Sequence, residues 1–455
     1  MCWWGRRRFV PAHLRGLQAC FDARTVSDFT QLLKRNRNYR LTWMGQIVSE
    51  VGDHFNNVAV LSLAVADTHS GAVISGIMLS RAIPAVAAGP LAGVFLDRFD
   101  RRRIMITSDL VRAVIALGFI FAISYHRTSL LYLLSALLMF ASPFFTSGRS
   151  AILPSLATDE ELHTANSLTQ TTGWLTLAVG AYFGGTSVAQ FGYQLAFVFN
   201  SLSFMFSAFC IWRLRSPKGH FRAENRSLNE TKVVRPWHEY REGLSYMVST
   251  PLILGIGLIA VGWASGGGAA QVLFTLYSEI VFNRGATGLG QLWGTAGVGL
   301  LIGGIVGNRI GKRISFESYK KTVFFCYLVH GGAYVVFSQM TNWPLALFFM
   351  GLSRATVAIS SVLNWSNLLR HVDDQYRGRV FSTIETMNWS TMMLSMMAAG
   401  IASVHYSIRA IGAVSGLLSS STAIFWGWAN WTGKLPEPRL TPDDAVVEIH
   451  GDPTT

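Results

Sequence analysis

Charged side chains lie inside several long apolar stretches of this sequence, where a charge is costly. Glu50, Asp53 and Asn57 stand in one of them with i, i+3 and i+7 spacing, so a helix carries all three on one face. An ionisable group in the middle of a hydrocarbon layer costs at least ~2.5–3.5 kcal/mol and therefore needs a partner or a role. Asp53 lies ~18 Å along such a helix from its start at Leu41, close to mid-depth. Because removal from water disfavours the charged carboxylate, Asp53 could exchange a proton between two aqueous faces.

Two interpretations of Asp53 are open at this stage. In the first, Asp53 titrates and lines a central cavity, with Glu50 as a shallower candidate for the same role. In the second, Asp53 is permanently paired with Arg81, which stands at a similar depth in the next apolar stretch. The two interpretations predict opposite behaviour, since a permanently paired carboxylate does not carry protons.

A second set of charges lies in later apolar stretches. Arg354 has no acid on its own helix, so it either binds an anionic group of a substrate or pairs with Glu385 in the following stretch. Asp109 and Arg112 are three residues apart, the spacing at which side chains on one helix face meet, and we expect a local ion pair.

The composition is that of a membrane protein. Hydrophobic residues make up 50% of the 455 positions and charged residues only 14%, much less charge than soluble chains carry. The net charge of +13 would suggest nucleic acid in a soluble protein, but here the basic residues stand in the gaps between apolar stretches. A helix needs about 20 apolar residues to cross a bilayer. That length predicts twelve spans, at 41–66, 72–96, 104–125, 130–150, 165–190, 192–212, 251–278, 288–308, 321–340, 343–366, 380–403 and 408–430. The first and fifth are the most polar of these.

The basic residues predict the orientation of the spans. With the N-terminus inside, and with residues within two positions of a span end assigned to the adjoining segment, 32 of the 38 Lys and Arg residues fall in inside segments, three in outside loops and three within spans. Positive residues accumulate on the cytoplasmic side of membrane proteins, so both termini are expected there. The predicted division is a basic tail (1–40), a six-helix bundle (41–212), a linker (213–250), a second six-helix bundle (251–430) and a second tail (431–455).

One short pattern occurs twice. Gly89 and Gly93 lead into Asp97 and a run of arginines that reads G-x-x-x-D-R-x-x-R-R from Gly93 to Arg102. Small residues four apart allow a second helix to pack closely. The pattern returns at 304–313 with Asn308 in the place of the acid, and two copies of an unusual pattern in corresponding places indicate an internal duplication.

Together these features resemble the major facilitator superfamily, and within it the branch of macrolide-efflux proteins and the enterobactin exporter. Further matching segments are 49–53 in the first span, 153–156 and 165–168 around the connection from the fourth span to the fifth, and 376–381 at the start of the eleventh. The resemblance implies an all-α polytopic membrane protein with twelve transmembrane helices in two pseudo-symmetric six-helix bundles. It also implies that the arginine loop latches the two halves in the outward-facing state. That role would fall on Gly89, Gly93, Asp97, Arg98, Arg101 and Arg102, with a weaker second copy at Asn308, Arg309 and Lys312. The family often has glycine where this chain has Asp100, which could add an ion pair to the loop.

The resemblance predicts a function in transport. We expect proton-coupled efflux of an amphipathic small molecule (a drug, macrolide or siderophore) across a bacterial inner membrane, by a monomer in the lipid bilayer. Lysophospholipid transport and a transport-inactive receptor or scaffold are the alternatives. An enzyme is not expected, because His54, His330 and His405 are isolated from other catalytic residue types. No cofactor, metal or nucleic acid is predicted, and the four cysteines lack metal-binding spacing.

Overall fold

The structure is a computed structural model, and it describes residues 23–125, 127–215, 221 and 236–438. These residues form fourteen α-helices and one π-helical turn, and no strand. The predicted tails before residue 23 and after residue 438, and most of the predicted linker, lie outside the described residues. The elements are α1 (Ala23–Arg35), α2 (Arg37–Thr68), α3 (Gly71–Arg98), α4 (Arg101–Tyr125), α5 (Thr128–Leu156), α6 (Asp159–Phe191), α7 (Tyr193–Trp212), α8 (Pro236–Ser249), α9 (Pro251–Leu276), η4 (Tyr277–Val281), α10 (Gly285–Gly311), α11 (Phe316–Gln339), α12 (Trp343–His371), α13 (Asp374–His405) and α14 (Ile408–Trp431).

Each of the twelve predicted spans corresponds to one long helix, α2 to α7 and α9 to α14. Among the described residues, nine of these helices are long and apolar enough to cross a membrane by composition alone. The other three, α2, α6 and α13, are 32, 33 and 32 residues long but carry too many polar residues. The sequence identified the first two as polar spans. The polar character of α13, which contains Glu385 and Asn388, was not anticipated.

Short polar segments begin several of the helices. The side chain of Asn36 accepts a hydrogen bond from the Tyr39 backbone at the start of α2, and Thr158 and Glu161 form a capping box at the start of α6. Such caps satisfy backbone N–H groups that have no partner within the helix. The tight connections between spans thus follow from local sequence.

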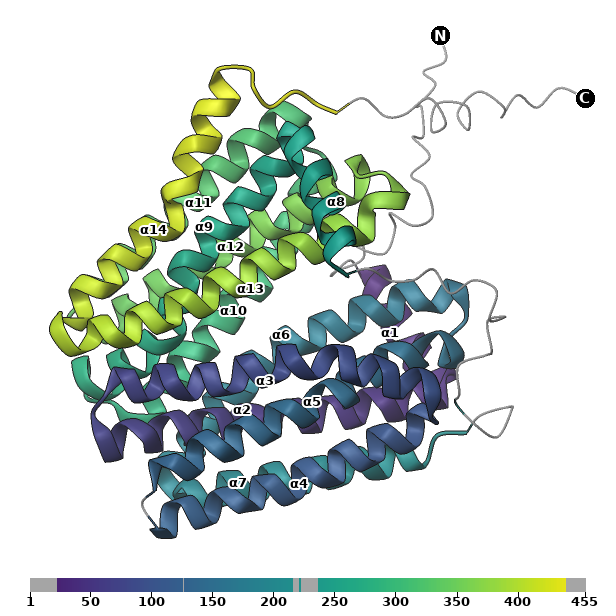
Figure 1. Ribbon diagram of the computed structural model, residues 1–455, viewed down its shortest axis with the longest axis vertical. Helices are drawn as coiled ribbons and strands as arrows, with labels where there is room; N and C mark the ends of the chain where they lie inside the picture. The colour runs from purple at the N-terminus through teal and green to yellow at the C-terminus, as the bar shows by residue number, and fades with distance from the viewer. Residues whose placement is uncertain (1–22, 126, 216–220, 222–235, 439–455) are drawn as a thin grey trace, which may run out of the picture.

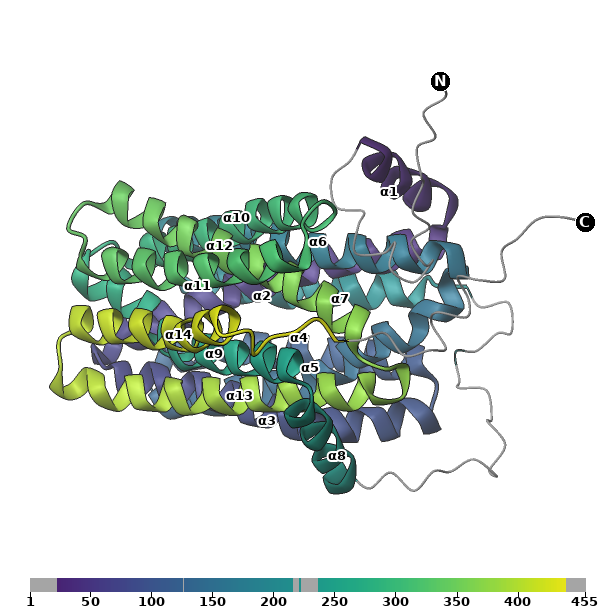
Figure 2. The same cartoon turned by 90° about the horizontal axis from the view of Figure 1, so that it is seen from above.

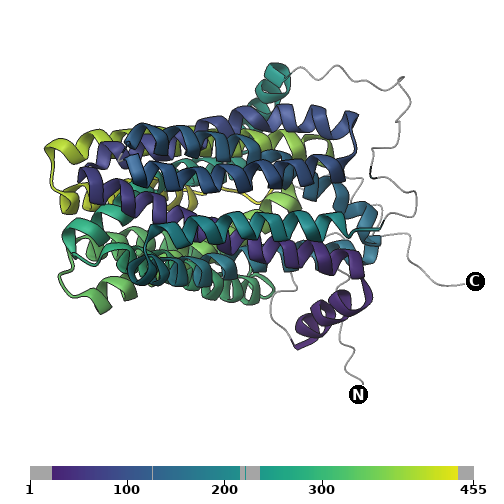
Figure 3. The ribbon, with the colours of Figure 1, turned by 90° about the horizontal axis from the view of Figure 1, so that it is seen from below.

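The helices α2–α7 form one bundle and α9–α14 form a second, with α8 lying against the second (Figure 1). We call the end that carries residues 97–103 the arginine-loop end, and the end that carries the turns at 69–70 and 282–284 the hairpin end. Figures 2 and 3 show α1 and α8 on opposite sides of the molecule, both toward the arginine-loop end.

The two bundles meet closely toward the hairpin end. Gly185 of α6 and Gly290 of α10 lie so close that a Cβ added to Gly290 would stand 2.4 Å from the Ala181 carbonyl oxygen. On the other side of the contact, the Ser75 hydroxyl of α3 donates a 2.8 Å hydrogen bond to the Met396 carbonyl of α13. Small residues let helix backbones approach where lipid supplies no hydrophobic driving force. Buried apolar residues of both bundles form one continuous cluster in this region.

The arginine-loop end is open between the bundles. There the buried apolar clusters are separate, one built from the second bundle and two from the first. A Cβ added to Gly89 or Gly93 would meet no atom within 4 Å. In Figure 1 the two bundles lie together at one end and diverge toward the other. The molecule is therefore closed at the hairpin end and open at the arginine-loop end.

Candidate functional site

Glu50 links three helices of the first bundle. Its carboxylate accepts 2.8 Å hydrogen bonds from Gln46 on α2 and from Thr176 on α6, and it pairs with Arg149 on α5 at 3.4 Å. The Glu50 and Arg149 side chains are 26% and 21% exposed, so the pair is only partly removed from water. Glu50 therefore holds α2, α5 and α6 together at this point of the bundle.

Asp53 lies one turn deeper on the same helix and has no such partners. Within the described part of the chain it forms no hydrogen bond and no ion pair, and its Oδ1 is buried without a partner. A carboxylate in this position is costly as an anion because nothing replaces its hydration. Protonation of Asp53 would remove that cost.

Arg81 does not pair with Asp53. Its Nη1 donates a 2.6 Å hydrogen bond to the side-chain oxygen of Asn57, one helical turn further along α2. The predicted pair between Asp53 and Arg81 is therefore not formed in this conformation, where the Arg81 guanidinium donates to Asn57 instead. Glu50, Asp53 and Asn57 do share one face of α2, but their partners differ. Glu50 bonds to Gln46, Thr176 and Arg149, Asn57 accepts from Arg81, and Asp53 has no partner among the described residues.

The predicted ion pair between Asp109 and Arg112 is present. Both side chains are buried, and the Arg112 guanidinium also lies over the rings of Phe145 and Phe204, at 4.7 and 4.3 Å from their centroids. Cation–π contact of this kind stabilises a cation away from water. These two charges are accounted for by packing within the first bundle.

Arg354 of α12 is a half-buried cation that has no anionic partner among the described residues. Its guanidinium lies 5.2 Å from the centroid of the Phe274 ring, and within the described residues it forms no hydrogen bond or ion pair. Glu385 is exposed on α13 and makes no ion pair with Arg354. The predicted alternative of an Arg354–Glu385 pair is thus not formed in this conformation.

The arginine loop is not engaged with the second bundle. Asp97 and Arg98 are exposed, and neither makes a hydrogen bond or ion pair in the described chain. Arg101 and Arg102 instead hold neighbouring helices of their own bundle, through the carbonyls of Ala151 and Trp212 respectively.

Within the described residues, Asp100 forms no additional ion pair. Its carboxylate accepts backbone hydrogen bonds from Arg103 and from Phe221 of the linker, both at 3.1 Å. The Arg101 backbone N–H in turn donates to the Phe221 carbonyl at 3.2 Å. The Phe221 side chain is buried among apolar residues of α4, α5 and α7. The extra acid therefore fastens the linker to the loop, a role that the sequence pattern did not indicate.

The second copy of the pattern is packed differently from the first. Asn308 is buried, and a Cβ added to the adjacent Gly307 would meet Ile359 of α12 at 3.0 Å. Arg309 and Lys312 are exposed. In this second copy, Asn308 replaces the acid, and the helix that carries it, α10, packs closely against α12 of the same bundle.

Two polar contacts were missed at the sequence level. Arg149 was assigned to the connection after the fourth predicted span because it stands next to the end of that span at residue 150, but α5 continues through Pro154 to Leu156 and carries Arg149 inside the bundle. Glu279 lies just beyond the predicted seventh span, on the π-helical turn η4, and accepts a hydrogen bond from Ser62 of α2. This contact joins the two bundles at the hairpin end, and π-helical turns are frequent at functional sites.

Two bundles of six long helices, closed at one end and open at the other around unpaired charges, are the architecture of a polytopic membrane transporter. The model of the Major Facilitator Superfamily matches residues 42–396, and the chain belongs to that family. It is an MFS transporter that takes a small-molecule substrate in the setting of a lipid bilayer, and not an enzyme.

Two named relatives match most of the chain in sequence. BacE of Bacillus amyloliquefaciens, whose name assigns it to bacilysin export, is 28% identical over 78% of this chain and 85% of its own. Macrolide efflux protein A of Streptococcus pyogenes is 24% identical over 86% of this chain and 95% of its own. The predicted branch with macrolide-efflux proteins is thus confirmed. A solved bacterial homologue of the iron transporter ferroportin, in an inward-facing state, aligns with a TM-score of 0.67 at 17% identity, covering 88% of this chain and 98% of its own. That likeness concerns the fold.

Proposed function

We propose that this protein exports an amphipathic small molecule across a bacterial inner membrane by proton antiport, working as a monomer with both termini in the cytoplasm. The relatives named for export and efflux support the direction of transport. The concentration of Lys and Arg at the arginine-loop end supports the orientation, because positive residues are retained on the cytoplasmic side. In this orientation the molecule is open to the cytoplasm.

The observation that carries the proposal is the unpartnered carboxylate of Asp53. A group that is buried without hydrogen bonds is poised to hold a proton, and exposure to the other side of the membrane in the alternate conformation would release it. Glu50 stands one turn away and is held by Arg149, so Asp53 is the carrier and Glu50 positions the helix.

The surroundings of Arg354 indicate which chemical group the substrate carries. A cation that lies over an aromatic ring and has no anion beside it among the described residues attracts an anionic group. Since Glu385 does not neutralise Arg354, we propose that the substrate carries a carboxylate or similar anion next to an apolar body. Asp53 belongs to the first bundle and Arg354 to the second. Movement of the two bundles relative to each other can therefore couple protonation of Asp53 to binding of an anion at Arg354.

Asp97 completes the cycle in this proposal. Its carboxylate and Gly93 face open space here, and they engage the second bundle when the cytoplasmic side closes. The latch consists of Gly89, Gly93, Asp97, Arg98, Arg101 and Arg102, with Asn308, Arg309 and Lys312 as its counterpart in the second bundle.

Efflux from proteoliposomes with an imposed pH gradient tests the proposal. A panel of fluorescent amphipathic compounds, anionic and cationic in matched pairs, is measured with and without an uncoupler. We expect gradient-dependent movement that favours anionic members, and loss of that preference in Arg354→Gln. Movement of lysophospholipid alone would support the alternative substrate, and binding without movement would support a receptor.

A further inference from the structure

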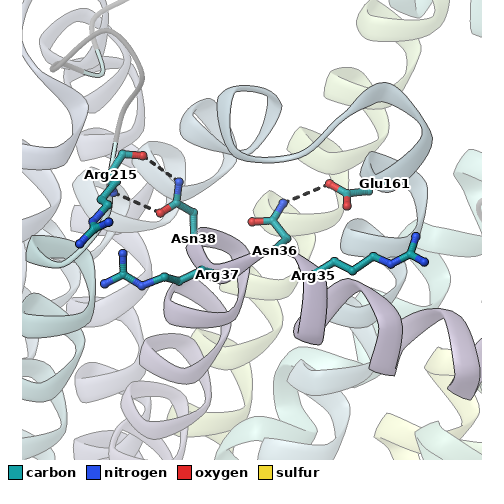
Figure 4. Close-up of a pocket in the computed structure, with 6 residues that line it drawn as sticks. All are labelled: Arg35, Asn36, Arg37, Asn38, Glu161 and Arg215. Atoms are coloured by element: carbon teal, nitrogen blue, oxygen red, sulfur yellow. Dashed lines mark hydrogen bonds between the residues drawn. The ribbon is translucent and has the colours of Figure 1, made fainter.

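A small pocket opens at the arginine-loop end of the first bundle. Its volume is about 360 Å³, at the lower end of the ~300–1,000 Å³ typical of ligand sites. It forms where α1 meets α2, beside the end of α7 and the start of α6. Its lining residues are Arg35, Asn36, Arg37, Asn38, Glu161 and Arg215 (Figure 4).

The charges of this pocket are not balanced. Three arginines face one acid, and the Glu161 carboxylate is already occupied by the side-chain amide of Asn36 at 3.1 Å and the backbone of Thr158 at 3.2 Å. Within the described residues, the side chains of Arg35, Arg37 and Arg215 make no hydrogen bond and no ion pair. The side chains of Arg37 and Arg215 extend to the same side of the pocket, whereas that of Arg35 extends toward Glu161 (Figure 4).

The pocket is held in place by a reciprocal contact. The Asn38 side chain donates to the Arg215 carbonyl at 2.7 Å and accepts from the Arg215 N–H at 3.1 Å. This fixes the end of α7 against the first turn of α2. Arg37 stands at the start of α2, where the helix dipole adds to the attraction for an anion. Among the described residues, the two guanidinium groups are thus positioned by the backbone and not by an acid.

The pocket lies at the depth expected of lipid headgroups. Trp212, three residues before Arg215, is 57% exposed. Phe209, one turn before Trp212 in α7, is 49% exposed. The Arg213 guanidinium lies 5.6 Å from the centroid of the Phe209 ring. Exposed aromatic residues at a helix end mark the boundary between headgroups and acyl chains.

We propose that Arg37 and Arg215, with Arg35 at the rim, bind the phosphate of an anionic phospholipid headgroup. Basic pockets between transmembrane helices hold such headgroups, and the adjacent apolar surface of α7 accommodates an acyl chain. The proposal depends on the orientation given above only for the identity of the leaflet. The lipid would fasten α1 and α7 to α2 at the membrane surface.

Lipid binding in detergent tests this site. The full-length protein is freed of bound lipid in a neutral detergent, and its thermal midpoint is followed during titration with short-chain phosphatidylglycerol, phosphatidylcholine or inorganic phosphate. A ligand that binds the folded state raises the midpoint by an amount that grows with the logarithm of its concentration divided by its Kd, so the titration yields the Kd. We expect phosphatidylglycerol to bind at least tenfold more tightly than the other two. Each arginine contributes about fivefold, so Arg37→Gln/Arg215→Gln should weaken phosphatidylglycerol about 25-fold.

The matched control is Arg313→Gln/Arg370→Gln. Both residues are exposed at the same end on the second bundle, and the change in net charge is identical. We expect its affinity to stay within twofold of the unaltered protein. Equal weakening in both double variants would overturn the proposal in favour of general surface charge, and equally tight binding of inorganic phosphate would overturn the lipid assignment. Should the first double variant not fold, Arg215→Gln alone is predicted to lose about fivefold. No gradient or transport enters this measurement, so its failure is distinct from failure of the proposed export.

Discussion

The close approach of α6 and α10 can be tested by the substitution Gly290→Val. An added Cβ would stand 2.4 Å from the Ala181 carbonyl oxygen, whereas ordinary contact begins at 3.4 Å, so the helices must separate by about 1 Å. Overpacking of this kind costs about 1–3 kcal/mol. The cost falls on the conformation that is closed at the hairpin end. The ratio between this and the alternate conformation should therefore shift about 5- to 150-fold.

Labelling of Ser75→Cys with a membrane-impermeant maleimide measures that ratio. Ser75 is buried between the bundles and bonds to the Met396 carbonyl, so a cysteine there reacts only when the hairpin end opens. In a background with the natural cysteines replaced by serine, Gly290→Val should raise the labelling rate by the factor above, and Gly290→Ala by less. Gly332→Ala is the control, because its added Cβ meets no atom within 4 Å. An unchanged rate in folded Gly290→Val protein, or an equal rise in the control, would refute the reasoning.

The remaining predictions concern the charges. Asp97→Asn should slow gradient-driven efflux from proteoliposomes at least tenfold, because hydrogen bonds to a charged group contribute about 1.5–3 kcal/mol, and an unaffected rate would remove the latch role. Asp53→Asn should keep substrate exchange at equilibrium but lose its response to an imposed pH gradient; a retained response would exclude Asp53 as the proton carrier. Arg81→Ala should not rescue Asp53→Ala in the same assay, since Arg81 bonds to Asn57, and rescue would point to a direct pair in another conformation. Glu50→Ala should lower the free energy of unfolding by about 1–3 kcal/mol and Glu50→Gln by less, as measured by thermal unfolding in detergent, and equal values would show that the hydrogen bonds of Glu50 contribute little.

Local rules predicted the long helices well. The twelve spans emerge because a bilayer needs long apolar segments, and the Asp109–Arg112 pair emerges because three residues bring side chains to one helix face. Rules of this kind depend on neighbours in sequence and need no knowledge of packing.

Contacts between helices could not be predicted in the same way. Whether Arg81 meets Asp53 or Asn57 depends on the offset of α3 along the axis of α2, because the two partners lie on one face of α2 and one helical turn apart. The Glu50–Arg149 pair depends on α5 carrying Arg149 toward α2, whereas composition alone ends this span next to Arg149 and assigns the arginine to a connection. The bond between Ser62 and Glu279 joins residues more than two hundred positions apart.

The sequence by itself determined that this chain crosses a membrane repeatedly as two related bundles, because hydrophobic length and the placement of arginines act locally. Only the tertiary structure decided which charges are neutralised and which are left without a partner, and at which end the halves meet. The reason is that a charge inside a bundle is satisfied by whichever neighbouring helix turns a polar group toward it, and helix packing alone sets that choice.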